Sequence, residues 1–475
     1  MKDYIKHHPW HIIEEGFDPK LNRVSESIFS IGNGKFGQRA NFEEKYSGDC
    51  LPGNYVAGVY YPDKTRVGWW KNGYPEYFAK VLNAPNWMRI NIRINGYSLD
   101  LSRCKVHEFT RTLDMKAGVL SRSFKATMQN GVTVTAHIER FCSLHNSTQA
   151  AFKYSFTLDK NADLRISSYI DGKIENEDSN YNQKFWKGVV SKAKDNNCLL
   201  ITETKKTEFQ VAVQTYTSLT KNDKDIPFSE RKTKSKSAKI TADFIAKKGQ
   251  EIVIDKRATI LSSLDVKKAD LETAARENCR TNCKRDFNEL KSEHAAAWAS
   301  KWEASDIIIE GDVSAQQAAR FSIFQLNCTY SGEDERLNIG PKGFTGEKYG
   351  GSTYWDTEAY CLPFYQATAK PEVARNLLIY RYKHLQKAIE NAEKLGFSCG
   401  AALYPMVTMN GEECHNEWEI TFEEIHRNGA IAYAIFDYIK YTADKKYLAE
   451  YGLEVLIGIA RFWAQRVNWS EHHQK

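Results

Sequence analysis

A glycine-rich segment that ends in tryptophan and aspartate is the first place where this sequence could do chemistry. Residues 340–358 read GPKGFTGEKYGGSTYWDTE, with five glycines ahead of Trp355 and Asp356. Glycines let a backbone approach a ligand closely. An indole beside a carboxylate suits a pyranose, because the ring covers C–H groups while the carboxylate accepts from two adjacent hydroxyls. Asp356 could also simply cap a helix, but the neighbouring tryptophan favours sugar binding.

A second segment concentrates carboxylates between two expected helices. Residues 404–424 read YPMVTMNGEECHNEWEITFEE and hold six glutamates together with His415 and Trp418. Carboxylates packed this densely repel one another unless they face water or a polyhydroxyl ligand. The nearest second histidine is His426, and hard cations prefer regular Asp/Asn patterns. The segment therefore favours a sugar site, and no metal site is predicted.

The two segments together could also supply a catalytic carboxylate pair. A glycosidase needs an acid and a base or nucleophile several Å apart across the sugar. Asp356 with Glu413, Glu417 or Glu419 would have the right chemistry. Their separation does not follow from the sequence, so this alternative stays open.

The segment Gly32–Gly37 matches G-x-G-x-x-G, the dinucleotide-binding pattern. That function needs a strand before the motif, a helix after it and an acidic residue about 20 positions on. The residues that follow, QRANF, do not begin an amphipathic helix. We therefore interpret the motif as a glycine-bent turn in a β-domain.

The overall composition narrows the function class. Of the 475 residues, 66 are basic and 60 acidic, a net charge of +6, which is a mixed surface and no nucleic-acid footprint. The 11 Trp, 25 Tyr and 23 Phe suit apolar sugar faces. The first residues lack a secretory signal and no long apolar stretch suggests a membrane span. Ten scattered cysteines fit reduced thiols, so a cytoplasmic protein is expected.

The elements that must position these residues fall into two classes. From about residue 9 to 264, short stretches alternate apolar and polar residues and are separated by turns such as Asn95-Gly96, which predicts a large β-sandwich. Beyond that point helices are expected, with one short strand at 306–309. The expected helical ranges are 271–305, 315–330, 355–367, 371–395, 423–442 and 445–467. About half a dozen helices are too few to close a ring of six helix pairs.

At the two carboxylate-bearing segments the sequence resembles glycoside hydrolase family 65. Residues 345–365, TGEKYGGSTYWDTEAYCLPFY, are similar to the family's barrel signature, in which Trp355 and Asp356 would hold the glucose whose bond is broken. Typical members have Gly-His before the tryptophan, where this chain has residues 352–354, STY. The resemblance implies a β + α multidomain fold. Its parts would be a β-sandwich over 1–268, a helical linker over 269–311 and the incomplete first part of an (α/α)6 barrel over 312–475.

Residues 415–423, HNEWEITFE, are similar to the family loop that contacts the acceptor-side sugar. Their sequence resembles the version of this loop in members that cleave maltose. The resemblance implies that the substrate contacts in this loop come from His415, Asn416, Glu417, Trp418, Glu419 and Thr421.

The resemblance also implies an activity. The expected reaction is inverting phosphorolysis of maltose to β-glucose 1-phosphate and glucose, with inorganic phosphate as co-substrate and no metal or organic cofactor. The family's acid, a glutamate in Gly-Pro-(Asp/Asn)-Glu-Tyr, is absent from this chain. It is expected beyond residue 475, so these residues alone should be inactive. A homodimer is expected for the full-length form. The alternatives are a hydrolase of kojibiose, nigerose or trehalose, and a non-catalytic sugar-binding fragment.

Overall fold

The computed structural model describes residues 4–64, 77–177, 183–282, 285–340, 342–347, 351–413 and 424–474. The chain divides into two compact units. Unit 1 comprises residues 1–59, 82–329 and 344–347, and unit 2 comprises residues 60–81, 330–343 and 348–475. Unit 1 is built mainly of β-strands and unit 2 mainly of helices, as the change in sequence pattern predicted.

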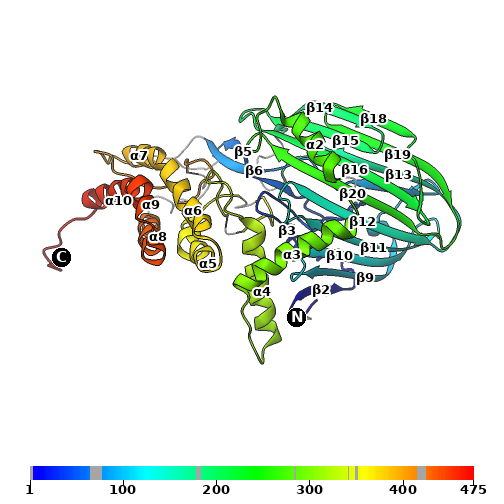
Figure 1. Cartoon of the computed structure of the whole chain (residues 1–475), viewed down its shortest axis with the longest axis horizontal. Helices are drawn as coiled ribbons and strands as arrows, with labels where there is room; N and C mark the ends of the chain where they lie inside the picture. The colour runs from blue at the N-terminus through cyan, green and yellow to red at the C-terminus, as the bar shows by residue number, and fades with distance from the viewer. Residues whose placement is uncertain are drawn as a thin grey trace. The chain divides into compact units, whose positions relative to one another are not determined.

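An antiparallel 11-stranded sheet dominates unit 1 (Figure 1). Its order is β1-β2-β9-β10-β11-β12-β20-β16-β15-β14, with β17 paired to β16. The strands are β1 Ile5–Lys6, β2 His11–Glu15, β9 Lys105–Asp114, β10 Val119–Thr127, β11 Thr133–Cys142, β12 Gln149–Leu158, β14 Trp186–Lys194, β15 Asn197–Thr204, β16 Gln210–Lys221, β17 Lys224–Asp225 and β20 Ile252–Ser262. Buried and more exposed residues alternate along β10 and β11, which is the period-two pattern expected of a sheet with one face in a core.

A second sheet packs against the first and makes unit 1 a sandwich. It has five strands in the order β18-β19-β13-β7-β8. The strands are β7 Ile90–Ile94, β8 Tyr97–Ser98, β13 Ala162–Asp171, β18 Glu230–Lys234 and β19 Ser237–Ala246. Ser168 of β13 shares a hydrogen bond of 2.8 Å with Thr217 of β16, which joins the two sheets inside the core.

Three helices of unit 1 follow the last strand of the sandwich. They are α2 Leu271–Asn282, α3 Phe287–Ser305 and α4 Val313–Thr329. Leu271 and Ala275 of α2 pack on Leu199 and Ile201 of the large sheet, and α2 lies over this sheet in Figure 1. Asp286 caps α3 by accepting from the Asn288 amide at 2.8 Å. A shorter helix, α1 Asn22–Ile28, and a one-turn helix, Leu101–Arg103, lie earlier in the chain.

The strand expected at residues 306–309 is wrong. These residues have no regular secondary structure, because a side chain takes the place of a neighbouring strand. The Gln316 amide donates to the Ile307 carbonyl at 2.8 Å and its oxygen accepts from the Ile309 N–H at 2.7 Å. Ile308 is 77% exposed and so adds nothing to a sheet core.

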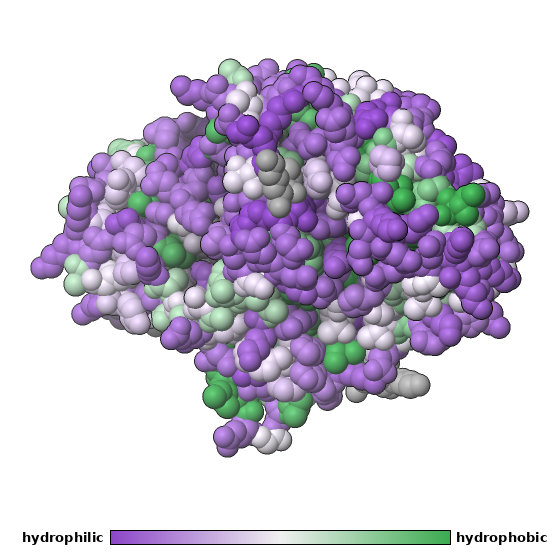
Figure 2. All heavy atoms as spheres, turned by 45° about the vertical axis from the view of Figure 1, so that its right-hand side comes forward, coloured by the Kyte–Doolittle hydropathy of each residue, from purple (hydrophilic) through white to green (hydrophobic). Residues whose placement is uncertain are grey.

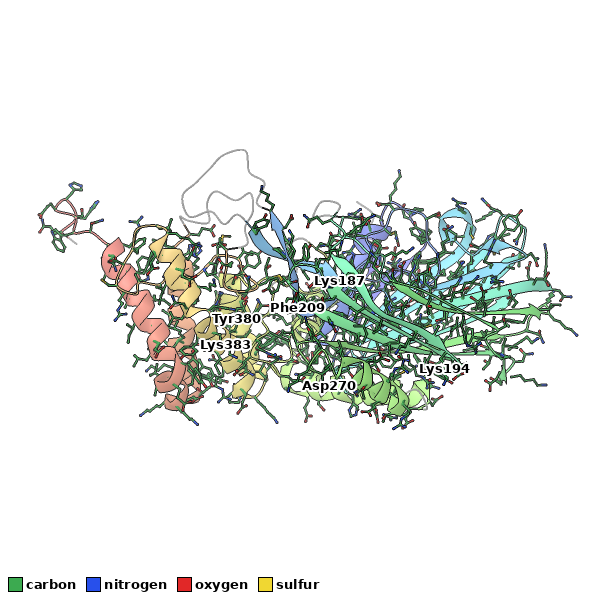
Figure 3. The ribbon with its side chains drawn as sticks, turned by 90° about the horizontal axis from the view of Figure 1, so that it is seen from above. Lys187, Lys194, Phe209, Asp270, Tyr380 and Lys383 are labelled. Carbon is green, nitrogen blue, oxygen red and sulfur yellow. The ribbon has the colours of Figure 1, made fainter. Side chains whose placement is uncertain are left out.

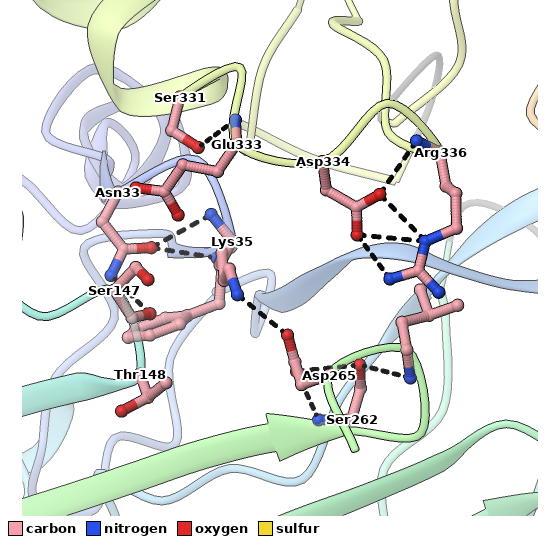
Figure 4. A network of polar contacts seen from close by, with 12 residues as sticks. Asn33, Lys35, Ser147, Thr148, Ser262, Asp265, Ser331, Glu333, Asp334 and Arg336 are labelled. Carbon is pink, nitrogen blue, oxygen red and sulfur yellow. Dashed lines mark hydrogen bonds and ion pairs between the residues drawn. The ribbon is translucent and has the colours of Figure 1, made fainter. Parts of the chain in front are cut away.

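The glycine motif at 32–37 forms a tight turn, as predicted. It joins β3 Ile31–Gly32 to β4 Phe36–Gln38 in a four-stranded sheet that continues with β5 Asn54–Lys64 and β6 Tyr77–Asn83. The Asn33 side chain accepts from the amides of Lys35 and Phe36, and Lys35 Nζ reaches Asp265 at 3.0 Å (Figure 4). A Cβ at Gly37 would lie 2.3 Å from the Phe344 ring, so close packing explains this glycine.

Unit 2 contains a run of short helices. They are α5 Leu362–Thr368, α6 Pro371–Lys383, α7 Leu385–Glu393, α8 His426–Thr442, α9 Lys445–Tyr447 and α10 Leu453–Arg466, with π-helical turns at Thr357–Cys361 and Leu448–Gly452. None of the described helices is both long and apolar enough to cross a membrane. The face drawn in Figure 2 is mostly hydrophilic, with hydrophobic side chains in small groups.

The single helix expected over 371–395 is in fact two. α6 ends at Lys383 and α7 begins at Leu385, with His384 between them at φ −105° and ψ 11°. The Arg381 carbonyl at this break accepts from the Tyr404 hydroxyl at 3.1 Å. The same carbonyl also accepts from the His384 N–H at 3.1 Å. A tertiary hydrogen bond and this shorter-range backbone bond thus replace the bond that a continuous helix would make to the fourth residue on.

Candidate functional site

Trp355 and Asp356 stand at the start of the helical segment that leads into α5. Both side chains are half-buried. Asp356 has helical backbone angles, φ −57° and ψ −31°, and its carboxylate makes no capping hydrogen bond. Within the part of the chain that the structure describes, no hydrogen bond or ion pair occupies this carboxylate. The capping interpretation is therefore wrong for Asp356, and its carboxylate is free to accept from a ligand.

Hydrogen bonds fix the residues that directly flank Trp355 and Asp356. Thr353 and Thr408 exchange backbone hydrogen bonds of 2.8 and 3.1 Å, which tie the glycine-rich segment to the 404–413 segment. The Thr357 hydroxyl donates to the Ile339 carbonyl at 2.9 Å and accepts from the Thr353 hydroxyl at 3.0 Å. These residues are buried, so the peptide that carries Trp355 has little freedom.

The Trp355 ring contacts two other aromatic rings. The centroid of the His426 ring lies 4.8 Å away and is nearly perpendicular to the indole, and that of Tyr360 lies 5.6 Å away. The edge-to-face pair with His426 stabilises the structure beyond the apolar area that it buries. His426 begins α8, so the first turn of that helix steadies the indole.

A buried ion pair, Arg381 with Glu358, contacts the residues on both sides of Trp355 and Asp356. Arg381 of α6 donates from Nε and Nη2 to the two Glu358 carboxylate oxygens, at 2.6 and 2.9 Å. Nη2 also donates to the Tyr354 carbonyl at 3.2 Å. Burial alone lowers the pKa of Arg381, but the Glu358 carboxylate more than offsets this and keeps it above its ordinary value. Tyr380 and Lys383, labelled in Figure 3, mark the part of α6 that carries Arg381.

The 404–413 segment is held by a second arginine and glutamate. Arg427 Nε, in the first turn of α8, donates to the Tyr404 carbonyl. Glu413 is 3% exposed and accepts from the amides of Met406 and Val407 at 2.8 and 3.0 Å. Burial lowers the pKa of Arg427, and Glu413, whose Oε2 lies 3.9 Å from Arg427 Nη2, opposes that shift.

These contacts change how Glu413 is interpreted. The sequence left open a catalytic pair of Asp356 with Glu413. In the structure both oxygens of Glu413 accept from backbone amides, so the side chain serves the loop and is not a free acid or base.

The remaining predicted contacts lie outside the described residues. His415, Asn416, Glu417, Trp418, Glu419 and Thr421 all fall within residues 414–423. Of the predicted sugar contacts, the structure therefore places Trp355 and Asp356. Among the residues described, no group of three or more His, Cys, Asp or Glu is placed to hold a metal ion.

Sequence reasoning missed the residues that support the pair. Glu358, Arg381 and Tyr404 were not singled out, because an arginine or glutamate in a helical pattern usually lies on a solvated face. Glu358 and Tyr404 do lie in the segments 340–358 and 404–424, but no pattern in the sequence marks them as supporting residues.

Comparison with known proteins gives matches over almost the entire chain. The model of the glycosyl hydrolase family 65 N-terminal domain matches residues 12–301, and that of the family's central catalytic domain matches residues 320–475. A maltose phosphorylase of Bacillus subtilis is 45% identical over 98% of this chain. A kojibiose phosphorylase of Caldanaerobacter subterraneus is 31% identical, and an alpha,alpha-trehalose phosphorylase of Thermoanaerobacter brockii is 32% identical.

A solved structure shows the same fold. It is of a protein provisionally named kojibiose phosphorylase, from the human microbiome. It is 29% identical, has a TM-score of 0.90, and is matched over 99% of this chain and 61% of its own. The chain likewise spans 61% of the maltose and kojibiose phosphorylases and 59% of the trehalose phosphorylase.

Proposed function

Because the chain belongs to glycosyl hydrolase family 65, we propose that the protein of which it is part is a disaccharide phosphorylase that acts on maltose. The observation that carries this proposal is the 45% identity to a maltose phosphorylase along 98% of the chain, against 31–32% for the kojibiose and trehalose enzymes. The site supports it, since an indole stands beside a carboxylate that has no hydrogen-bond partner among the described residues, at the end of a glycine-rich segment.

In the proposed reaction a phosphate oxygen attacks the anomeric carbon of the non-reducing glucose. The glycosidic bond breaks, and a carboxylic acid protonates the leaving oxygen of the second glucose. One displacement inverts the anomeric carbon, which gives β-glucose 1-phosphate and free glucose. Phosphate is the nucleophile, so one acid suffices and no metal or organic cofactor is needed. We place that acid, a glutamate, outside residues 1–475.

Trp355 and Asp356 would hold the glucose whose bond breaks. Asp356 would accept from two adjacent hydroxyls while the indole covers a C–H face. The loop 415–423, with His415, Asn416, Glu417, Trp418, Glu419 and Thr421, would contact the acceptor-side glucose and set linkage preference. Residues 312–475 would form the first part of an (α/α)6 barrel after a helical linker at 269–311. A cytoplasmic homodimer remains part of the proposal.

Replacing Asp356 tests the site. In a protein that carries these residues together with any that follow them, Asp356→Ala should lower kcat/KM for maltose about a hundredfold or more, because charged hydrogen bonds of a few kcal/mol are lost in the transition state. Asp334→Ala is the matched control. Asp334 lies in the same unit but its carboxylate is paired with Arg336 (Figure 4). Equal kcat/KM for the Asp356→Ala variant and wild type, at equal melting temperatures, would overturn the assignment.

A further inference from the structure

Arg381 touches both sides of the peptide that carries the two predicted sugar contacts. Its Nη2 donates to the Tyr354 carbonyl, one residue before Trp355. Its Nε and Nη2 hold the carboxylate of Glu358, two residues after Asp356. The side chains of Arg381 and Glu358 are each only 1% exposed. A bidentate pair of this kind fixes direction as well as distance, which a lysine could not do.

Arg381 also contacts residues 404–413, the second segment of the candidate site. Its backbone carbonyl accepts from the Tyr404 hydroxyl at 3.1 Å. The Tyr404 carbonyl in turn accepts from Arg427, and the Tyr404 amide donates to the Asn428 side chain at 3.1 Å. A continuous series of buried hydrogen bonds therefore runs from the Trp355–Asp356 peptide to the segment that leads to residue 413.

We propose that the buried Arg381–Glu358 pair is a positioning element that holds Trp355 and Asp356 in register with residues 404–413. The inference rests on the proposed phosphorylase function for its kinetic consequence, but not for its structural one. Neither residue touches sugar in this account. They act through the backbone at Tyr354 and through the helical turn that Glu358 shares with Asp356. Misplacing reacting groups by about 1 Å can lower turnover about a hundredfold.

An ion pair in unit 1 provides a matched control. Arg122 holds Glu44 and Glu43 with hydrogen bonds of 2.7 and 2.9 Å, and its side chain is 5% exposed. Arg122→Lys changes the same chemistry as Arg381→Lys in a unit without predicted sugar contacts. It should lower thermal stability without changing kcat/KM per folded molecule.

Two measurements test the proposal, and the first needs no activity. Arg381→Lys and Glu358→Gln should each speed hydrogen exchange of the 353–361 backbone at least tenfold, whereas Arg122→Lys should leave that segment unchanged. Unchanged exchange in both Arg381→Lys and Glu358→Gln would overturn the proposal, whatever the protein catalyses.

The second measurement is a double-mutant cycle on maltose phosphorolysis with Asp356→Asn. We expect Arg381→Lys to lower kcat/KM at least tenfold in the wild-type background and less than twofold in the Asp356→Asn background, because the arginine acts through Asp356. Equal losses in both backgrounds would show a general structural role and contradict the proposal. If Arg381→Lys does not fold, Glu358→Gln takes its place in the cycle. Absence of phosphorolysis in the wild type would instead overturn the proposed function and leave the exchange test intact.

Discussion

Both units of the molecule bury arginine–glutamate pairs, but the pairs hold backbone segments with different roles. In unit 1, Arg122 and Arg140 bind the Glu43 carboxylate at 2.9 and 2.7 Å, and Arg122 also binds Glu44. Burial raises the pKa of Glu43, but the two arginines more than offset this and hold it below its ordinary value. This cluster ties the 39–44 segment onto strands β10 and β11.

In unit 2, the Arg381–Glu358 pair ties together backbone that carries predicted sugar contacts. The hydrogen bonds have the same chemistry in the two units. The difference is that the segment held in unit 2 carries predicted sugar contacts and the segment held in unit 1 does not. Burial and pairing therefore do not distinguish a structural ion pair from one that positions a site. Disruption of either pair should lower stability, but only disruption of the unit 2 pair should also lower kcat/KM per folded molecule.

The largest effect is expected when the unit 1 cluster loses an arginine. Arg122→Ala leaves Glu43 and Glu44 buried without their shared partner, which should cost about 3–5 kcal/mol of unfolding free energy. Urea unfolding followed by circular dichroism measures this. Arg165→Ala is the control, because Arg165 pairs with Glu230 and Asp243 at a side-chain exposure of 41% and should cost under about 1 kcal/mol. Similar losses for the two variants would remove the distinction between buried and exposed pairs.

A smaller effect on the same unit depends on pH. His294 accepts from the Leu144 amide at 2.9 Å and its other nitrogen meets the Gly118 carbonyl at 3.0 Å. Burial lowers its pKa to about 4. The unfolded chain takes up a proton as the pH falls through about 6.5, while the folded imidazole stays neutral, so stability is full above 6.5 and lost towards 4.

The expected loss from His294 between pH 7.5 and 5.0 is about 2 kcal/mol. Urea unfolding at both pH values should show that His294→Gln, which keeps a donor and an acceptor, loses about that much less than wild type over this interval. An identical pH dependence in the two proteins would show that His294 is protonated in the folded state at pH 5.0.

The smallest effect is expected for a residue of unit 2 that contacts Trp355. His426→Ala removes the ring that lies 4.8 Å from Trp355. Because His426 is exposed, folding stability should stay within about 0.5 kcal/mol. Because the indole is then positioned less firmly, kcat/KM for maltose should fall about two- to tenfold. His107→Ala, an exposed histidine of unit 1, should leave kcat/KM unchanged, and an equal decrease in both variants would rule out a specific role for His426.

The fold classes of the two regions could be predicted from the sequence because they depend on local pattern. The alternation of apolar and polar residues over about 9–264 predicted a sandwich of strands such as β11, and the glycines at 32–37 predicted a turn. The break at His384 could not be predicted, since it accompanies a hydrogen bond from Tyr404 twenty residues on. The absent strand at 306–309 depends in the same way on the side chain of Gln316.

The sugar-binding residues of the candidate site could be predicted, but the residues that hold them in place could not. Trp355 and Asp356 stand out because their types and glycine-rich context are visible in the sequence. Glu358 and Arg381 look like ordinary helix-surface charges until the structure brings them together. Glu413 shows the converse, because a carboxylate in an acid-rich loop proves to be bound to backbone amides.

Phosphorolysis of maltose is tested by incubating maltose with the protein, including any residues that follow these 475, with and without inorganic phosphate. Proton NMR of the anomeric region would identify the products as they form. Maltose should be consumed only with phosphate present, with β-glucose 1-phosphate and glucose appearing in equal amounts. Release of two glucose molecules without phosphate would contradict it and indicate a hydrolase, and no consumption of maltose under either condition would contradict the assigned substrate.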